Sequence, residues 1–314
     1  MKTNILLSVI MLTYNHEEYI DLSLGSALNQ ETNFDYEIII GDDCSQDKTV
    51  EKIAEYQVKN PDKIKLIARK KNLGVVKNLL ETLKLCKSKY IAILDGDDYW
   101  NSSLKLQKSV DFLEQNKEYI ATYNNVLCVD QYNNPRDDFF QKNLGDLKHI
   151  QEQLDYNPIV TCSLVFKNIW GESFIDVYSC YLKNIKYICD LSLKILLVEN
   201  GKIKHFKEPL STYRLVESGT SAFSAQKQLI QIEDEIQAYL NILDNISPNN
   251  FYPVKKRLQQ TMYQGIKKIF ISKDIISLSK LLKTNYKTGY FKTIPFFKHC
   301  FRKAVTKLWT EKSQ

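Results

Sequence analysis

Short runs of apolar residues alternate with helical patterns over the first hundred residues. The strand-like runs cover residues 5–12, 36–41, 64–68 and 90–94. Apolar residues at helical spacing fill the stretches between them, at residues 17–29, 47–59 and 76–83. Because strands and helices in alternation build parallel sheets with right-handed crossovers, the pattern predicts an α/β fold with a mostly parallel sheet and flanking helices.

The chain beyond residue 100 is less regular. It predicts strands near residues 119–129, 160–167 and 203–214, and a helix over residues 185–199. From Gln226 onward the pattern is helical almost throughout. We therefore expect an α/β domain over residues 1–222, with halves at about 1–100 and 101–222, followed by a helical region over residues 223–314.

Charge is distributed unevenly along the chain. Residues 251–314 hold 15 Lys and Arg against 2 Asp and Glu, so this segment carries +13 and the rest of the chain −7. Two apolar helical faces in the segment have basic residues beside them. The first face is formed by Leu258, Met262, Ile266 and Ile269, and the second by Phe297, Phe301, Val305 and Leu308. Such faces are typical of helices at an anionic membrane surface, which is an expected partner; the alternative is that they pack on the α/β domain.

Several features indicate the compartment. The 7 cysteines are scattered without a C-x-x-C pair, which is typical of reduced thiols in a cytosolic protein. The apolar run at residues 5–12 leads into Thr13 and Tyr14 rather than a small-residue cleavage site, so we expect a buried strand and not a signal peptide. No run of about 18 apolar residues is present. The expected location is cytoplasmic, peripheral on the inner face of the cytoplasmic membrane.

Acidic residues directly follow two of the predicted strands. Residues 36–41 lead into Asp42 and Asp43, and residues 90–94 lead into the Asp-Gly-Asp-Asp of residues 95–98. Because the carboxyl ends of parallel strands meet at one edge, both clusters are expected on the same rim. Crowded carboxylates favour a cation, and oxygen ligands suit Mg²⁺ or Mn²⁺, which often bring phosphate oxygens with them. The rim predicts a metal and diphosphate site, although each cluster alone also fits a polar turn.

Other ligand classes lack their motifs. The chain contains neither the dinucleotide fingerprint G-x-G-x-x-G nor the P-loop G-x-x-x-x-G-K-S/T. Aromatic residues do lie beside lysines in the basic segment, but no motif for binding RNA or DNA accompanies them. Nucleic acid is therefore not an expected partner.

Four ordered motifs resemble those of the family 2 glycosyltransferases of bacterial surface-polysaccharide synthesis, over about residues 5–220. They are Ser8-Val-Ile-Met-Leu-Thr-Tyr-Asn15, Glu37-Ile-Ile-Ile-Gly-Asp-Asp-Cys-Ser-Gln-Asp47, Asn72-Leu-Gly74 and Tyr90-Ile-Ala-Ile-Leu-Asp-Gly-Asp-Asp-Tyr-Trp100. The resemblance implies a GT-A (Rossmann-like) catalytic domain. It also implies inverting transfer from a nucleoside-diphosphate sugar, expected to be a UDP-sugar, with Mn²⁺ or Mg²⁺, onto a carbohydrate or polyprenyl-linked saccharide.

The resemblance further implies roles for individual residues on the rim. The nucleotide pocket would be lined by Thr13, Tyr14 and Asp43. The carboxylate of Asp43 would accept a hydrogen bond from the base. Asp95 would meet the ribose or the sugar of the donor. Asp97 would hold the metal, with Asp98 as the second choice for a ligand.

Asp190 is the candidate catalytic base. In the family the base precedes a helix, a Gly-containing turn and a Tyr-Arg strand, and Asp190, Gly201 and residues 209–214 follow that order. Cys189 stands where an acidic residue is usual, and Val216 follows the Tyr-Arg pair where many relatives have a histidine. The chain therefore lacks a second carboxylate beside the base and a histidine that could contact the metal or the diphosphate.

These roles are consistent with elementary chemistry. A sugar hydroxyl needs a carboxylate within hydrogen-bond reach to take its proton, and a metal stabilises a departing diphosphate. Asp190 also fits a helix N-terminal acid that the helix dipole favours. Two other classes stay open: a sugar nucleotidyltransferase, which would show a glycine-rich phosphate loop near its start, and a non-catalytic sugar-binding module, which would lack a base.

Overall fold

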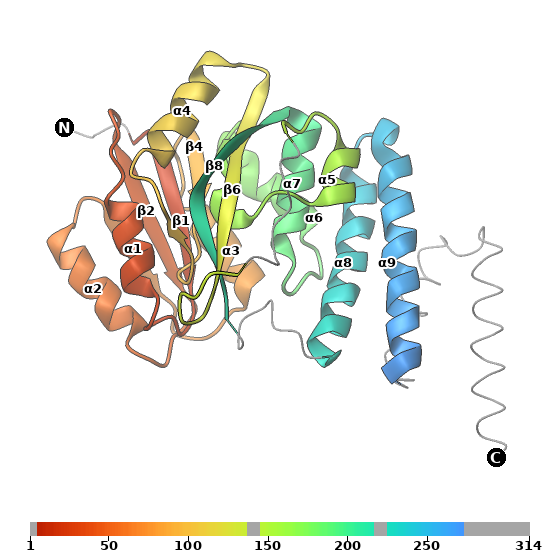
Figure 1. Ribbon diagram of the computed structural model, residues 1–314, viewed down its shortest axis with the longest axis horizontal. Coiled ribbons are helices and arrows are strands. Elements are labelled where there is room, and N and C mark those ends of the chain that lie inside the picture. The colour runs from red at the N-terminus through yellow and green to blue at the C-terminus, as the bar shows by residue number, and fades with distance from the viewer. Residues whose placement is uncertain (1–4, 137–144, 217–224, 273–314) are drawn as a thin grey trace.

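The computed structural model describes residues 5–136, 145–216 and 225–272. Strands in these ranges form one sheet in the order β3-β2-β1-β4-β7-β6-β8-β5 (Figure 1). Its first half is parallel and consists of β1 (Leu7–Thr13), β2 (Tyr36–Asp42), β3 (Ile64–Ala68) and β4 (Tyr90–Ile93). All four lie on the predicted runs, which confirms the α/β class and the parallel arrangement of this half.

The second half of the sheet is mixed. β7 (Val165–Lys167) runs antiparallel to β4 and to β6 (Tyr119–Asp130), whereas β6 and β8 (Lys202–Leu215) are parallel. β5 (Tyr99–Trp100), which the pattern did not predict, runs antiparallel to β8. The predicted strand at residues 160–167 is shorter than expected because its first part is a 3₁₀ turn. The sheet as a whole is therefore less uniformly parallel than the alternation in the sequence suggested.

Helices cover both faces of the sheet, and β1 separates two cores. Val9 and Met11 pack with one set of helices, whereas Ile10 and Leu12 pack with another, because alternate side chains of a strand point to opposite faces. The first set is α1 (Ile20–Leu28), α2 (Thr49–Lys59) and α4 (Lys105–Gln115). The second set includes α3 (Val75–Leu83), α5 (Ile150–Tyr156), α6 (Phe174–Tyr181) and α7 (Cys189–Asn200).

Two long helices complete the second face. α8 (Ala225–Asn245) and α9 (Phe251–Ser272) lie side by side next to α5, α6 and α7, on the side of the molecule away from α2 (Figure 1). Ile236 and Tyr239 of α8 are each 2% exposed and belong to the same core as the sheet residues Ile10 and Ile91. The C-terminal helices therefore share the core of the α/β fold.

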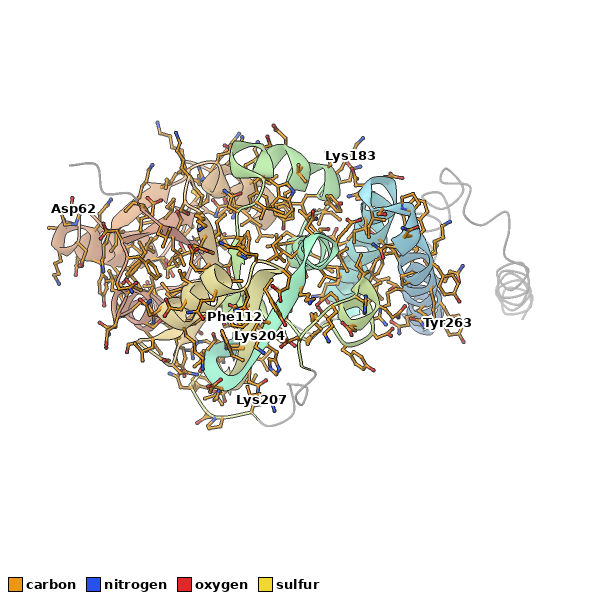
Figure 2. The ribbon with its side chains drawn as sticks, turned by 90° about the horizontal axis from the view of Figure 1, so that it is seen from above. Asp62, Phe112, Lys183, Lys204, Lys207 and Tyr263 are labelled. Atoms are coloured by element: carbon orange, nitrogen blue, oxygen red, sulfur yellow. The ribbon has the colours of Figure 1, made fainter. Side chains whose placement is uncertain are left out.

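The first of the two apolar faces expected at a membrane packs on the protein. Leu258 and Met262 of α9 are each 3% exposed and lie in the same core, whereas Tyr263 lies on the outer side of the helix and is 46% exposed (Figure 2). The side chains of Ile266 and Ile269, and the second face at residues 297–308, lie outside the described residues. Among the helices described, none is long and apolar enough to cross a membrane.

Candidate active site

The carboxyl ends of β1, β2 and β4 meet at one rim of the sheet. Thr13, which ends β1, lies opposite Asp42, which ends β2, and the amide of Asp43 donates to the carbonyl of Thr13 at 2.9 Å. On the other side of β1, the amide of Gly96 donates to the carbonyl of Leu12 at 2.9 Å. The two acidic segments therefore flank β1, one on each side.

Gly96 allows the acidic turn after β4 to approach β1 closely. A Cβ atom at this position would lie 2.6 Å from Cγ2 of Thr13 and 2.7 Å from Nδ1 of His16. Real Cβ atoms do not approach other atoms this closely, so any side chain here would push the turn away from β1. The glycine between Asp95 and Asp97 therefore sets the position of both carboxylates relative to the rim.

The Asp42-Asp43 cluster is satisfied by the protein itself. Oδ2 of Asp42 accepts from the Thr13 hydroxyl at 2.8 Å, and Oδ1 accepts from the amide of Ser45 at 2.9 Å. The two carboxylate oxygens of Asp43 accept from the amides of Leu73 at 2.7 Å and Gly74 at 2.9 Å. Asp43 therefore fixes the Asn-Leu-Gly loop of residues 72–74 against the rim.

Thr13 and Tyr14, both predicted to line the nucleotide pocket, differ in exposure. The side chain of Thr13 is enclosed, since the residue is 2% exposed and its hydroxyl is donated to Asp42. Tyr14 is 45% exposed. The structure thus presents the ring of Tyr14 on the rim, and Thr13 supports the rim from beneath.

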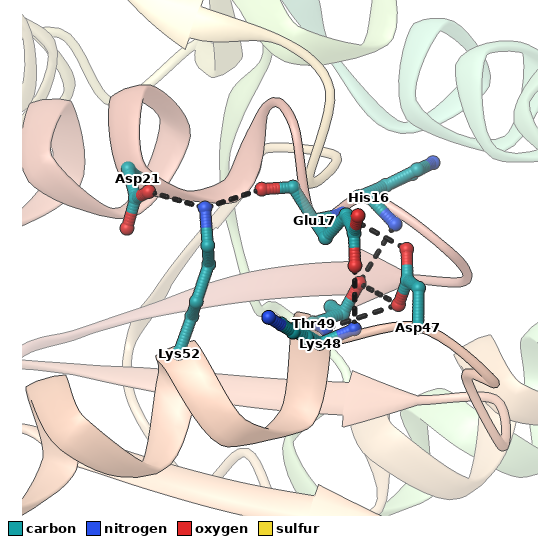
Figure 3. A network of polar contacts seen from close by, with 7 residues as sticks. All are labelled: His16, Glu17, Asp21, Asp47, Lys48, Thr49 and Lys52. Atoms are coloured by element: carbon teal, nitrogen blue, oxygen red, sulfur yellow. Dashed lines mark hydrogen bonds and ion pairs between the residues drawn. The ribbon is translucent and has the colours of Figure 1, made fainter.

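A polar network joins the loop after β1 to the start of α2 (Figure 3). The amide of His16 donates to the Thr49 hydroxyl at 2.8 Å, and the amide of Glu17 donates to Asp47 at 3.1 Å. Lys52 donates to the carbonyl of Glu17 at 2.6 Å and to the carboxylate of Asp21, on α1, at 2.7 Å. The two loops that border Tyr14 are therefore held as one unit.

Asp95, Asp97 and Asp190 form a second acidic group, which has an excess of negative charge. Burial, together with the charges of Asp97 and Asp190, raises the pKa of Asp95 to about 7. Asp190 comes from α7, so the group joins the turn after β4 to a helix of the second half of the fold. The structure thus brings the candidate base near two of the residues predicted to bind the donor and the metal.

Asp98 lies beneath this group. It is 1% exposed, and its carboxylate accepts from the amide of Arg214 at 2.9 Å. Nε of Arg214 donates to the carbonyl of Asp97 at 2.9 Å, and its guanidinium lies over the ring of Tyr19 at 4.7 Å. Burial and the charges of Asp97 and Asp95 raise the pKa of Asp98. Asp98 and Arg214 therefore brace the turn that carries Asp97.

Asp190 is held by a buried lysine. Nζ of Lys194, one turn further along α7, lies 2.6 Å from Oδ2 of Asp190, and the lysine side chain is 4% exposed. The Asp190 side chain is 37% exposed, and the Thr161 hydroxyl lies 3.5 Å from the same oxygen. Burial acts to raise the pKa of Asp190, but the attraction and hydrogen bond of Lys194 outweigh it, so the pKa lies below its usual value.

The residues fit a metal that is shared with a ligand. In the described ranges, no group of three or more His, Cys, Asp or Glu residues is arranged to hold an ion alone. Mg²⁺ and related ions are commonly bound through one or two carboxylates plus phosphate oxygens of a substrate. The charge excess at Asp95 and Asp97 favours a cation at that place, and the small number of ligands favours one that arrives with a diphosphate.

Two residues of this site, Lys194 and Arg214, were given no role from the sequence. Lys194 stands four residues after Asp190, and that spacing alone predicts an ion pair on one helix face. Arg214 was recognised as part of a motif, yet its contacts with Asp97 and Asp98 depend on the pairing of β5 with β8, which the pattern did not predict.

Several bacterial proteins are similar in sequence. An uncharacterized protein of Mycobacterium tuberculosis is 30% identical over 208 residues, which are 66% of this chain and 58% of the relative. An uncharacterized glycosyltransferase of Haemophilus influenzae is 28% identical over 301 residues, 88% of this chain and 89% of the relative. The chain thus spans less than two thirds of the mycobacterial relative but most of the one from Haemophilus.

A third relative has a more specific name. It is the UDP-Glc:alpha-D-GlcNAc-diphosphoundecaprenol beta-1,3-glucosyltransferase WfgD of Escherichia coli, which is 32% identical over 165 residues, 49% of this chain and 62% of the relative. Its name specifies a UDP-sugar donor and a lipid-linked saccharide acceptor.

Solved structures show the same fold at low sequence identity. TarS residues 1–349 of S. aureus superimpose with a TM-score of 0.60 and 16% identity, covering 96% of this chain and 79% of TarS. The same protein in complex with UDP-GlcNAc also gives a TM-score of 0.60, at 17% identity, covering 96% of this chain and 79% of that one. These similarities establish the GT-A type of fold that the sequence motifs implied.

The family model described as glycosyl transferase family 2 matches residues 8–173, more than half of the chain. The matched region includes β1, β2 and β4, together with Asp43, Asp95 and Asp97. The acidic rim, the α/β sheet and this match agree, and the chain belongs to glycosyl transferase family 2.

Proposed function

We propose that the protein transfers a sugar from a nucleoside-diphosphate sugar onto a saccharide hydroxyl, with inversion of the anomeric centre. The proposed donor is a UDP-sugar. One observation carries the proposal. The carboxylates of Asp95, Asp97 and Asp190 come from two halves of the fold and lie close enough for Asp97 and Asp190 to raise the pKa of Asp95, and Asp190 is paired with a buried lysine. A site for transfer needs a place for a diphosphate and a base for the acceptor, and this group offers both.

The nucleotide would lie on the rim beyond β1 and β2. Tyr14, 45% exposed, offers a ring face on which a base can stack. The Asp43 carboxylate is fixed by the amides of Leu73 and Gly74, and each of its oxygens retains a lone pair for the base. The complex of TarS with UDP-GlcNAc and the name of WfgD support a uridine nucleotide.

The transfer is a single displacement. Asp190 takes the proton of the acceptor hydroxyl as its oxygen bonds to the anomeric carbon, and the bond from that carbon to the diphosphate oxygen breaks. Lys194 keeps Asp190 ionised against the effect of burial, so that the base is ready at neutral pH. Attack opposite the departing diphosphate inverts the centre.

Asp97 would hold a divalent cation, Mn²⁺ or Mg²⁺, with Asp98 behind it as support rather than as first ligand. When bound, the cation supplies charge stabilisation for the departing diphosphate. A mannosyltransferase of Pyrobaculum calidifontis in complex with GDP-Man and Mn²⁺ superimposes with a TM-score of 0.50 at 15% identity, and the Mn²⁺ in that complex supports this choice.

The acceptor would be a saccharide, either free or carried on a polyprenyl diphosphate as in the name of WfgD. The reaction would then belong to the synthesis of a surface polysaccharide. Contact with an anionic membrane through residues 251–314 would bring the protein to such an acceptor. Because Leu258 and Met262 are buried, the contact would use the lysines of this segment and the residues beyond 272. Co-sedimentation with anionic vesicles at low salt, lost at high salt or after truncation at residue 272, tests this part.

The reaction itself is tested with a panel of nucleotide sugars. We expect Mn²⁺-dependent release of a nucleoside diphosphate from one of them, slow with water and faster with a saccharide acceptor, and no release by the Asp97→Ala variant. Formation or consumption of pyrophosphate would instead indicate a sugar nucleotidyltransferase. Binding of a sugar nucleotide with no turnover under any acceptor would indicate a binding module.

A further inference from the structure

The segment that leads into the proposed base is held from one side by a single helix. Residues 181–188 run from the last residue of α6 to the residue before α7, and Asp190 lies in the first turn of α7. Asp234 and Asn241 of α8 both reach this segment and are 4% and 5% exposed. α8 belongs to the region beyond residue 222, which the sequence separated from the catalytic domain.

Asp234 binds the end of the segment. Its Oδ2 atom accepts from the amides of three consecutive residues, Lys186 at 3.0 Å, Tyr187 at 2.5 Å and Ile188 at 3.3 Å. These residues directly precede Cys189, where α7 begins. A buried carboxylate that collects three amides fixes the chain at the point where it enters the helix.

Asn241 binds the beginning of the same segment. Its Nδ2 group donates to the carbonyl of Tyr181 at 3.0 Å and to the carbonyl of Lys183 at 2.7 Å (Figure 2 labels Lys183). Its Oδ1 accepts from Gln237 at 2.9 Å, which sets the orientation of the amide. Two buried side chains of α8 thus hold both ends of the segment, one through amides and one through carbonyls.

We propose that α8 positions the catalytic base: Asp234, with Asn241 as second anchor, holds residues 181–188 so that Asp190 faces the acidic rim. This inference rests on the proposed function, since it concerns the base assigned there. Asp190 is on α7, whereas Asp95 and Asp97 are on the turn between β4 and β5, so a shift of the segment moves the base relative to the donor. A misplacement of about 1 Å can reduce turnover by as much as 10²-fold.

The region beyond residue 222 therefore has a role in the reaction as well as in the core. The donor side of the site lies on β1, β2 and β4, whereas Asp234 and Asn241 hydrogen-bond, among the described residues, to the segment before α7 and to Gln237 of α8. Loss of Asp234 should accordingly affect transfer and leave donor binding unchanged, which separates positioning from general loss of structure.

The test compares Asp234→Ala and Asp234→Asn with Leu243→Ala in the full chain. Leu243 is 4% exposed and lies on the opposite side of the α8 wheel from Asp234, so it controls for loss of packing on the same helix. We expect Asp234→Ala to lower kcat by about 10- to 100-fold with the donor Kd unchanged, because the amides of residues 186–188 lose their acceptor. Asp234→Asn, which keeps one acceptor oxygen, should recover part of the loss, and Leu243→Ala should retain normal kcat at temperatures where it is folded.

Two further measurements identify the cause. Hydrogen exchange of the amides of residues 186–188 should be faster in Asp234→Ala, with exchange in β1 and β4 unchanged. Adding Asp234→Ala to Asp190→Asn should cause no further loss, because positioning acts through Asp190. The inference about α8 is overturned, with the proposed function intact, by either of two results. One is an equal loss of kcat from Asp234→Ala in the wild type and in Asp190→Asn, and the other is a kcat of Asp234→Ala equal to that of Leu243→Ala. Normal turnover by Asp190→Asn itself removes the base and overturns both proposals.

Discussion

The two acidic clusters of the rim follow similar strands, yet their surroundings differ. Asp42 and Asp43 end β2, and the carboxylate oxygens of both accept hydrogen bonds from hydroxyls or backbone amides of the protein. Asp95 follows β4 and is buried. Its burial and the charges of two further carboxylates, Asp97 and Asp190, all raise its pKa. The carboxylates of the first cluster are bonded within the protein, whereas the surroundings of Asp95 disfavour its ionised form unless a cation is present.

This difference separates architecture from chemistry in residues that look alike in the sequence. A carboxylate that already holds backbone amides contributes to the shape of a binding surface, as Asp43 does for the loop at residues 72–74. A carboxylate crowded by others favours a cation and a substrate that brings one. This difference supports the proposal that the reaction takes place at Asp95 and Asp97 and that the nucleotide is recognised at Asp43.

The largest expected effect concerns the base. Asp190→Asn should reduce transfer by roughly two orders of magnitude or more, because the amide cannot take a proton, while the donor affinity stays the same. Steady-state transfer assays together with donor titrations measure both quantities. Near-normal turnover would show that transfer does not need the Asp190 carboxylate.

A smaller effect is expected at the first cluster. Asp43→Ala removes the acceptor of two backbone amides, so the free energy of unfolding should fall by about 1–3 kcal/mol. The variant should also bind the nucleotide more weakly, with or without metal, since the loop at residues 72–74 loses its anchor. Chemical denaturation and titration with UDP measure the two effects. A metal-dependent defect in this variant would mean that the two clusters do not have separate roles.

Lys194 gives the smallest effect, visible in the pH dependence. Burial acts to raise the pKa of Asp190, but the attraction and hydrogen bond of Lys194, with the backbone amides of Leu191 and Asp190, hold it below its usual value. Lys194→Met removes the main lowering influence and leaves burial opposed only by the backbone amides, so the pKa of Asp190 rises and the acidic limb of the pH–rate profile should move to higher pH. Lys194→Arg, which keeps the cation, is the control. A limb that stays in place in Lys194→Met would show that another group governs it.

Much of the donor half could be predicted from the sequence. Buried runs followed at once by Asp43 or Asp95 identify parallel strands and their ligand edge, because local patterns decide both. The second half could not be predicted in the same way. β7 pairs antiparallel with β4, the two-residue β5 pairs with β8, and Asp234 reaches a segment 46 to 48 residues away in the sequence. These are long-range pairings with no local signal, although the i,i+4 pair of Asp190 and Lys194 was available from spacing alone.

The expected membrane face illustrates the same limit. Leu258 and Met262 have the spacing of an amphipathic helix, and that spacing is the same whether the face meets lipid or a protein core. In the structure both side chains are 3% exposed among residues of the α/β core. The periodicity predicted the helix correctly, and the neighbours of that face were set by the packing of α8 and α9.

Thermal stability in the presence of UDP-sugars tests the central claim most directly, since a ligand that binds only the folded state raises the melting temperature, and raises it more at higher concentration or affinity. The wild-type protein and Asp97→Ala would be scanned with a panel of UDP-sugars, with Mn²⁺ or with excess chelator. We expect at least one UDP-sugar to raise the Tm of the wild type with Mn²⁺ only, and no such increase in Asp97→Ala. An equal rise in chelator, or a metal-dependent rise that persists in Asp97→Ala, would contradict the assignment of the second cluster as a metal and diphosphate site.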